Sequence, residues 1–308
     1  MARPRISVSI AAHFIPHRAR FLAQVLRAIA GWQSTDASVI VDTNDLEIQS
    51  APEVRDACQR LKSNGIQIEF ALADKIEHPH HLTWVHKQRL RDWSSKTGSE
   101  SDYFIYLEDD IVLSADNLDY LLQTYPKAAA IGRTPGLIRW EADQDGNRFA
   151  TDFLEPQIIG VAETLKINEE QYVEPKFPYW AGFIVDRKLA QEYLRSSWAE
   201  RDSDEAIDRM EATDCRAQSA FGPTFVAVPR GSGSRMIVPV DTRLRPLSQC
   251  LVHHSAQNYV SDSSNDFARI PLEMIFRPSG WAANLDLSFI RLGALFRRVR
   301  RKLVRVFS

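Results

Sequence analysis

The stretch that most constrains the fold is residues 103–113, where an apolar and aromatic run ends in three consecutive carboxylates. The first five residues do not alternate with polar ones, which is typical of a short strand covered on both faces of a sheet. Because side chains alternate along a strand, we expect Glu108 and Asp110 on one side and Asp109 on the other. Carboxylate oxygens gathered at a strand end suit a hard divalent cation.

A simpler interpretation of the same residues is a solvated acidic turn. Ser114 follows the carboxylates closely and is a good helix N-cap, so the acids could merely precede a helix. We favour the cation site because the carboxylates come directly after a buried strand.

The acidic strand resembles the Asp-x-Asp-type metal motif of GT-A glycosyltransferases, here in a Glu-Asp-Asp form. The segment that continues to Pro126, with a helix over residues 117–122, is especially similar to the N-acetylglucosaminyltransferase I family. The resemblance implies that Asp110 holds Mn²⁺ or Mg²⁺ against the diphosphate of a nucleotide-sugar. It also implies that Glu108 and Asp109 lie beside that donor.

The composition indicates a folded protein. The chain has 308 residues, 44% hydrophobic and 25% charged, enough for one large domain or two small ones. Its three cysteines are far apart and form no Cys-x-x-Cys pattern, which argues for a reducing compartment and against structural zinc. We see no signal peptide and no apolar run long enough to span a bilayer.

Three strand-and-helix units precede the acidic strand. Strands are expected at residues 6–12, 38–41 and 66–70, and helices at residues 21–29 and 54–61. This order predicts an α/β fold, GT-A-like and Rossmann-like, with a mostly parallel sheet flanked by helices. No Gly-x-Gly-x-x-Gly or Walker sequence is present, which excludes the usual dinucleotide and P-loop classes.

The resemblance places the donor nucleotide at the ends of the early strands. It implies that the loop after the first strand meets the base, and that a basic helix over residues 82–93 lies near the nucleotide. An acid at the end of the second strand commonly accepts a hydrogen bond from a nucleotide. The candidate nucleotide-binding residues are His13, Phe14, Arg18, Asp42, Lys87 and Arg89.

Four histidines fall within residues 78–86, but we do not expect them to bind metal. Structural transition-metal sites normally add cysteine or carboxylate at defined spacing, and Pro79 interrupts any helix here.

The second half of the chain is expected to bind the acceptor. Strands are predicted at residues 128–131, 136–140 and 224–229 and a helix at residues 187–194, while residues 141–176 are polar and irregular. We therefore divide the chain into a nucleotide-sugar-binding half (1–135), an acceptor-binding and catalytic half (136–260) and a C-terminal extension (261–308).

The resemblance also implies a catalytic base and a late histidine. GT-A families place an acid near the start of a helix to deprotonate the acceptor hydroxyl, and the candidates here are Glu211, then Asp214, with Asp208 one turn earlier. His253 and His254 match by position a further ligand to the metal or diphosphate. Adjacent strand residues point apart, so we expect one of the two to contribute.

The C-terminal residues 289–308 form a predicted amphipathic basic helix. Seven basic residues and no acid occupy residues 291–308, so the net charge of −2 leaves −9 on the remainder. Such a helix suits the plane of an anionic membrane, with packing on the body as the alternative. We expect a cytoplasmic protein, peripheral at the inner face of the membrane, and no nucleic-acid partner.

The sequence therefore predicts a metal-dependent glycosyltransferase that uses a nucleotide-sugar, with a uridine diphosphate leaving group favoured. The acceptor is expected to be a glycan or a lipid-linked molecule. One alternative is a nucleotidyltransferase acting on sugar phosphates, although the glycine- and basic-rich loop usual after its first strand is missing. The other is a non-catalytic carbohydrate- or calcium-binding module.

Overall fold

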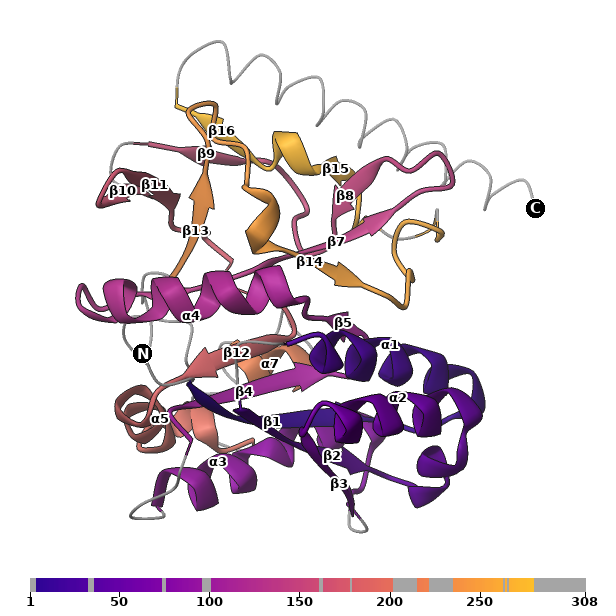
Figure 1. The fold of residues 1–308 in the computed structure, drawn as a ribbon. Coiled ribbons are helices and arrows are strands. Elements are labelled where there is room, and N and C mark those ends of the chain that lie inside the picture. The colour runs from indigo at the N-terminus through magenta and orange to yellow at the C-terminus, as the bar shows by residue number, and fades with distance from the viewer. Residues whose placement is uncertain are drawn as a thin grey trace.

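A five-stranded sheet forms the base of the protein in the computed structural model (Figure 1), with the strand order β12-β4-β1-β2-β3. The structure describes residues 4–32, 36–73, 76–95, 101–160, 163–177, 179–201, 215–221, 235–262, 264 and 266–279. The parallel strands are β1 (Arg5–Ala12), β2 (Asp36–Thr43), β3 (Gln67–Leu72) and β4 (Tyr103–Glu108), and β12 (Gly182–Val185) pairs antiparallel to β4. This sheet confirms the predicted α/β class.

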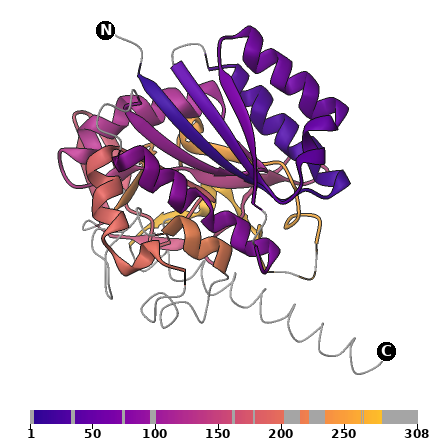
Figure 2. The same ribbon diagram turned by 90° about the horizontal axis from the view of Figure 1, so that it is seen from below.

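Helices cover both faces of this sheet (Figure 2). Helices α1 (Ala19–Ala30) and α2 (Pro52–Ser63) share one core with Ile105 and Leu107 of β4. On the other face, Phe104 and Tyr106 pack in a second core with α3 (His86–Ser95) and α5 (Arg187–Leu194). The acidic strand is thus buried on both sides, as its unbroken apolar run predicts.

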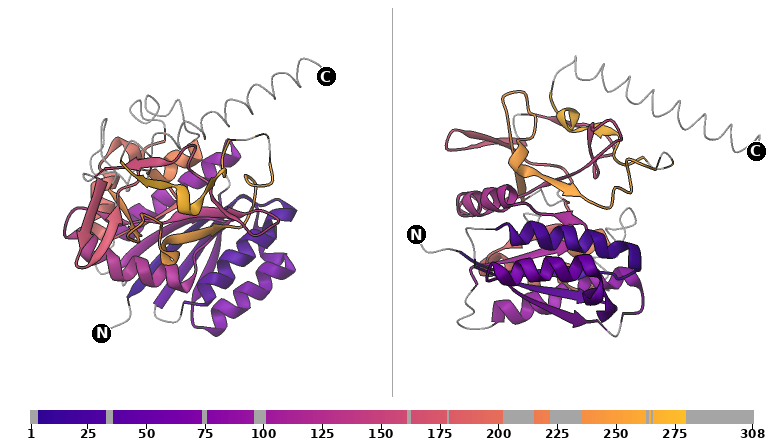
Figure 3. Two further views of the ribbon diagram at one scale, coloured as in Figure 1. Left: turned by 90° about the horizontal axis from the view of Figure 1, so that it is seen from above. Right: turned by 45° about the vertical axis from the view of Figure 1, so that its right-hand side comes forward.

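Three smaller sheets form the other half of the molecule, and helix α4 (Ala115–Ala129) lies between the halves (Figures 1 and 3). One sheet has the order β15-β8-β7-β14-β5 and another the order β10-β11-β13-β6, while β16 pairs with β9. Their strands are β5 (Ile111–Val112), β6 (Thr134–Pro135), β7 (Ile138–Ala142), β8 (Arg148–Ala150), β9 (Gln157–Ile159), β10 (Thr164–Ile167), β11 (Glu170–Val173), β13 (Met236–Val240), β14 (Leu251–His254), β15 (Ile270–Pro271) and β16 (Phe276–Pro278). A further α-helix among the described residues is α7 (Cys215–Phe221), and short 3₁₀ helices include η1 (Pro16–Arg18) and η3 (Pro79–Trp84).

The start of α4 brings the acidic turn close to β14. Ser114 caps the helix in a capping box with Asn117, so the predicted N-cap is confirmed. The Asn117 amide also donates to the carbonyls of Gln249 and Leu251, at 2.9 and 3.0 Å. Strand β14 pairs with β5 immediately after the acidic turn, which places the late histidines beside the carboxylates.

Two predictions about secondary structure are wrong. Residues 128–131 do not form a strand, because α4 runs to Ala129 and its alanine-rich end is a strong helix former. Residues 141–176 are not irregular throughout, since they include the short strands β8 to β11. The helix expected over residues 187–194 is confirmed as α5. The expected strand at 224–229 and the tail at 289–308 lie outside the described residues.

None of the helices in the described part of the chain is both long and apolar enough to cross a bilayer.

Candidate active site

A cavity of about 1300 Å³ opens at the carboxyl ends of β1 and β4. Its walls come from both halves of the molecule, including the loops after β1, β8 and β11 and the segment after β14. Ligands of open α/β sheets bind at the carboxyl ends of the strands. A volume above the 300–1,000 Å³ typical for one small molecule leaves room for two substrates.

The three carboxylates line this cavity, but they do not alternate as expected. Strand β4 ends at Glu108, so Asp109 and Asp110 lie in the turn before β5 and both contact Arg18. Arg18 Nη2 lies 3.0 Å from Asp110 Oδ2, and Arg18 Nε donates to Asp109 Oδ2 at 3.2 Å. A single guanidinium from η1 therefore offsets part of the charge of both acids.

Burial and mutual repulsion change how these acids hold protons. Burial, followed by the neighbouring Asp110 charge, raises the pKa of Glu108 to about 6 and that of Asp109 to about 7. Burial alone would also raise the pKa of Asp110, but His254 and the Arg18 and Arg139 charges outweigh it and lower that pKa. Asp110 is therefore the most firmly ionised of the three.

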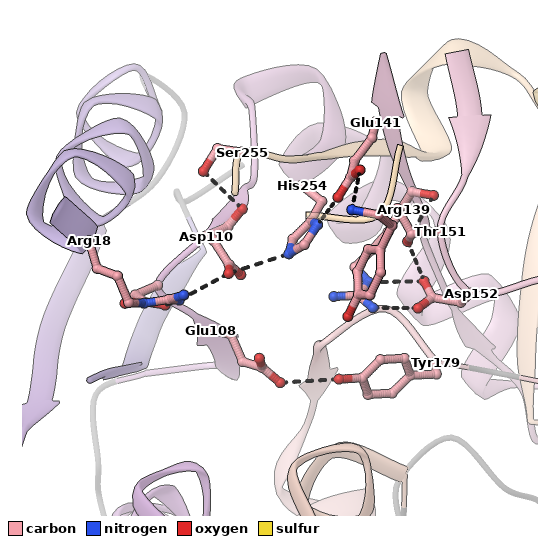
Figure 4. A network of polar contacts seen from close by, with 12 residues as sticks. Arg18, Glu108, Asp110, Arg139, Glu141, Thr151, Asp152, Tyr179, His254 and Ser255 are labelled. Carbon is pink, nitrogen blue, oxygen red and sulfur yellow. Dashed lines mark hydrogen bonds and ion pairs between the residues drawn. The ribbon is translucent and has the colours of Figure 1, made fainter. Parts of the chain in front are cut away.

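Asp110 belongs to a buried chain of contacts that runs through His254 to Glu141 (Figure 4). His254 Nε2 lies 3.3 Å from Asp110 Oδ2, and its Nδ1 lies 2.6 Å from Glu141 Oε1. Burial lowers the pKa of His254, but the two carboxylates more than compensate and raise it to about 9. Ser255 donates from its backbone N–H and its hydroxyl to the Asp110 carbonyl, at 2.9 and 3.2 Å, which fixes the turn.

Glu141 is the residue that orients His254. It is fully buried in β7, and its Oε2 accepts the backbone N–H groups of Tyr259 and Val260 at 2.9 and 2.7 Å. With both oxygens engaged, the carboxylate is fixed and directs the far nitrogen of the imidazole toward Asp110. A carboxylate behind a histidine is the usual support of a metal-binding imidazole.

The donor set fits a cation that takes some of its ligands from substrate. Asp110 Oδ1 is buried and has no hydrogen-bond partner among the described residues, and a cation would satisfy it. Neighbouring ligands of an octahedral ion are about 3 Å apart, close to the distance between Asp110 and His254. Among the described residues, no group of three or more acidic, histidine or cysteine side chains is arranged to bind a metal ion. Mg²⁺ is usually bound by one or two protein carboxylates together with substrate phosphates.

A second polar pair forms the opposite wall (Figure 4). The guanidinium of Arg139 pairs with Asp152, and both side chains are almost fully buried. Tyr179 stacks over Arg139 at 4.9 Å and donates its hydroxyl to Glu108 Oε1 at 3.2 Å. Arg139, Glu141 and Asp152 were not among the site residues predicted from the sequence. One signal in the sequence is that Arg139 and Glu141 carry charges two residues apart in the otherwise apolar stretch that forms β7, which places both on one face of the strand.

The predicted nucleotide-binding residues do not all reach the cavity. His13 and Arg18 line it. Asp42 instead pairs with Arg89, whose Nη2 donates to Asp42 Oδ1 at 2.8 Å. Asp42 also accepts a hydrogen bond from the Ser9 hydroxyl at 3.2 Å. Neither belongs to the lining, and neither does Phe14, whose backbone N–H donates to Asn44 Oδ1 at 2.6 Å.

Lys87 is also away from the cavity. Its ammonium is buried against the Tyr193 hydroxyl and the Ser219 carbonyl and lies 5.2 Å from the Trp84 ring. Burial lowers its pKa well below the usual range, and the nearby Arg91 charge adds to this effect. The position suits packing between α3 and α5.

The two late histidines face in different directions, as strand alternation predicts. His253 packs against Trp140 with ring centres 4.8 Å apart, and Gln257 Nε2 lies 3.1 Å from its Nε2. It does not line the cavity, whereas His254 does. The candidate bases Glu211 and Asp214 lie outside the described residues, together with Asp208.

No family model matches this sequence, and no curated protein matches it. One solved structure to which the chain is similar is the crystal structure of S. aureus TarS, with 9% sequence identity and a TM-score of 0.33. The match covers 62% of this chain and 29% of that chain.

Proposed function

We propose that the protein is a metal-dependent glycosyltransferase. It moves a sugar from a nucleotide-diphosphate sugar, with uridine diphosphate favoured as leaving group, to a hydroxyl of a glycan or lipid-linked acceptor. One observation carries the proposal. The carboxylates at the end of β4 open into a cavity with room for two substrates, and Asp110 faces an imidazole supported by the buried Glu141.

Asp110 and His254 would hold Mn²⁺ or Mg²⁺ together with donor diphosphate oxygens. When bound, the ion would offset the negative charge that develops on the leaving diphosphate. Arg18 lies beside the same carboxylates and is able to turn toward a diphosphate oxygen. Its pKa is raised, since the Asp109 and Asp110 charges outweigh the effect of burial, so it stays cationic throughout.

The acceptor proton needs a base, and Glu211 remains our first candidate, with Asp214 second. Asp214 directly precedes α7, and Arg216 in the first turn of that helix lines the cavity. Replacing the true base by its amide should lower turnover severely with donor affinity unchanged, because the residue acts on the acceptor. Normal turnover of both Glu211→Gln and Asp214→Asn would exclude these two residues as the base.

The test of the proposal is calorimetric titration with uridine and guanosine diphosphates, each with and without Mn²⁺. We expect uridine diphosphate to bind, and to bind more tightly with Mn²⁺. Absence of binding by either nucleotide would contradict the proposal and favour the non-catalytic module. Pyrophosphate release from uridine triphosphate and a sugar phosphate would identify a nucleotidyltransferase instead.

A further inference from the structure

The mouth of the cavity carries an unusual share of exposed apolar side chains. Seven large hydrophobic residues are exposed among the described residues, and four of them line this cavity. They come from four separate segments, after β1, between β8 and β9, between β11 and β12, and before β15. These four residues, called the apolar rim below, are Ile15, Leu154, Phe177 and Phe267.

Single exposed apolar residues are ordinary, but several around one opening mark a binding surface. Leu154 is the most exposed of the seven, at 63%. Its chain neighbours on both sides, Phe153 and Glu155, also line the cavity, so the leucine lies on the wall itself. The rim is thus part of the same cavity as the carboxylates.

Two aromatic steps connect the rim to the charged floor. On one wall, Phe267 lies 5.6 Å from Tyr259, which stacks on His254 at 5.4 Å. On the other wall, Phe177 lies 6.3 Å from Tyr179, whose hydroxyl donates to Glu108. The lining therefore changes from a mouth where the apolar rim lies beside polar residues such as Glu155 and Lys176, to aromatic rings with polar tips, and then to the buried carboxylates.

This gradient matches a molecule with an apolar chain at one end and a hydroxyl at the other. Aromatic rings alone would suit either a sugar face or an apolar chain. Leu154 and Ile15 favour the apolar chain over the sugar face. Aliphatic side chains form no hydrogen bonds with sugar hydroxyls, and their burial is favourable only against apolar groups. The exposed Lys176 next to Phe177 lines the same mouth and could meet an anionic linkage.

We propose that the acceptor is an amphiphile, whose alkyl or prenyl chain lies on the apolar rim while its hydroxylated head reaches the carboxylates. This inference rests on the proposed function and narrows its acceptor to the lipid-linked class. It assigns Leu154 and Phe177 as specificity-determining residues that recognise the chain.

The test measures direct binding of methyl, hexyl and octyl glycosides of one hexose to the full-length protein, below the micelle concentration. Affinity should rise with chain length, by about tenfold or more from methyl to octyl. Leu154→Ser and Phe177→Ser should each remove most of that gain. Leu72→Ser and Ile131→Ser, at sites outside the cavity lining whose exposure lies between those of Leu154 and Phe177, should keep it.

Equal binding of methyl and octyl glycosides would overturn the inference, and so would equal losses in the rim and control variants. The measurement needs no donor, so it is informative even where the proposed function fails. Nucleotide binding by Leu154→Ser should match that of the unaltered protein. If the unaltered protein binds uridine diphosphate but binds methyl and octyl glycosides equally, only the amphiphilic acceptor is excluded.

Discussion

His254 Nε2 lies 3.3 Å from Asp110 Oδ2, and this contact joins β14 to the turn after β4. Neither residue could hold this arrangement alone. The Asp110 carbonyl is fixed by Ser255, and the imidazole is fixed by Glu141 from the opposite side. The geometry of the candidate metal site therefore depends on a residue of β7 that does not itself line the cavity.

The first prediction concerns Glu141→Gln. The glutamine amide carries no negative charge beside His254. It also has a single oxygen, which cannot replace both the oxygen that contacts His254 and the oxygen that accepts two backbone N–H groups. Mn²⁺ affinity in the presence of uridine diphosphate should fall about 10–100-fold, as expected for a carboxylate behind a metal-binding imidazole. Calorimetry provides the measurement, and Glu47→Gln, at an exposed site, is the matched control. Unchanged affinity in Glu141→Gln would mean that His254 takes no part in binding.

The second prediction concerns Arg18, which contacts the proposed metal ligand Asp110 and its neighbour Asp109. In Arg18→Gln, Mn²⁺ without nucleotide should bind about tenfold more tightly, because a competing positive charge is gone. Uridine diphosphate with Mn²⁺ should bind more weakly, since the diphosphate loses a cationic partner. Arg20→Gln changes an exposed neighbour in the same segment and should do neither. If both variants bind free Mn²⁺ with equal affinity, the Arg18 charge does not weaken Mn²⁺ binding at this site.

A third prediction follows from the raised pKa of His254, about 9 in the folded protein. A pKa raised above the unfolded value of about 6.5 stabilises the fold fully below pH 6.5, and this contribution is lost as pH rises through 9. The contribution is on the order of 3 kcal/mol at most. The raised pKa values of Glu108 and Asp109 act in the same direction between about pH 4.5 and 7, because the folded protein then binds more protons.

His254 should therefore contribute a fall in the free energy of unfolding from pH 6.5 to 9.5, measured by urea unfolding in EDTA, while the lowered pKa of the buried Lys87 contributes a rise. His254→Gln should flatten that fall, whereas His17→Gln, at an exposed site, should retain it. The same pH dependence in His254→Gln and in the unaltered protein would show that the imidazole is not held between two carboxylates in solution.

The sequence was sufficient to predict the half of the fold that local patterns specify. The buried acidic strand, the flanking βα units and α5 follow from apolar runs and helical spacing, because each element carries its own signal. The wrong strand at residues 128–131 arose because alanines carry little apolar contrast, and helix propensity decided the outcome.

The site could be predicted only in part. Asp110 and His254 stood out through the resemblance, but Glu141, Arg139 and Asp152 come to the cavity by the pairing of β7, β8 and β14. That pairing joins segments far apart in the chain, and short strands carry too weak a pattern to reveal it. Lys87 carries a charge suited to a nucleotide, yet it is buried beside Tyr193, because packing rather than charge sets its place.

The fourth prediction concerns the tail, residues 289–308, and rests on sequence alone. Seven basic residues beside a Leu/Phe face should bind anionic vesicles, at about 1 kcal/mol per basic residue near the surface. Co-sedimentation should show binding to anionic but not neutral vesicles, with loss in high salt or after deletion of residues 289–308. Failure to bind either vesicle would leave the tail as a packing element.

The most direct test of the central claim is Mn²⁺-dependent hydrolysis of a uridine diphosphate sugar by Asp110→Asn. The amide removes the negative charge and replaces one of the two carboxylate oxygens by an NH2 group, while it keeps the size of the side chain. Asp145→Asn, in the exposed turn between β7 and β8, is the matched control, and both variants should melt cooperatively. We predict that Asp110→Asn loses at least about a hundredfold in turnover while Asp145→Asn keeps it. A folded Asp110→Asn variant with normal Mn²⁺-dependent turnover would contradict the account.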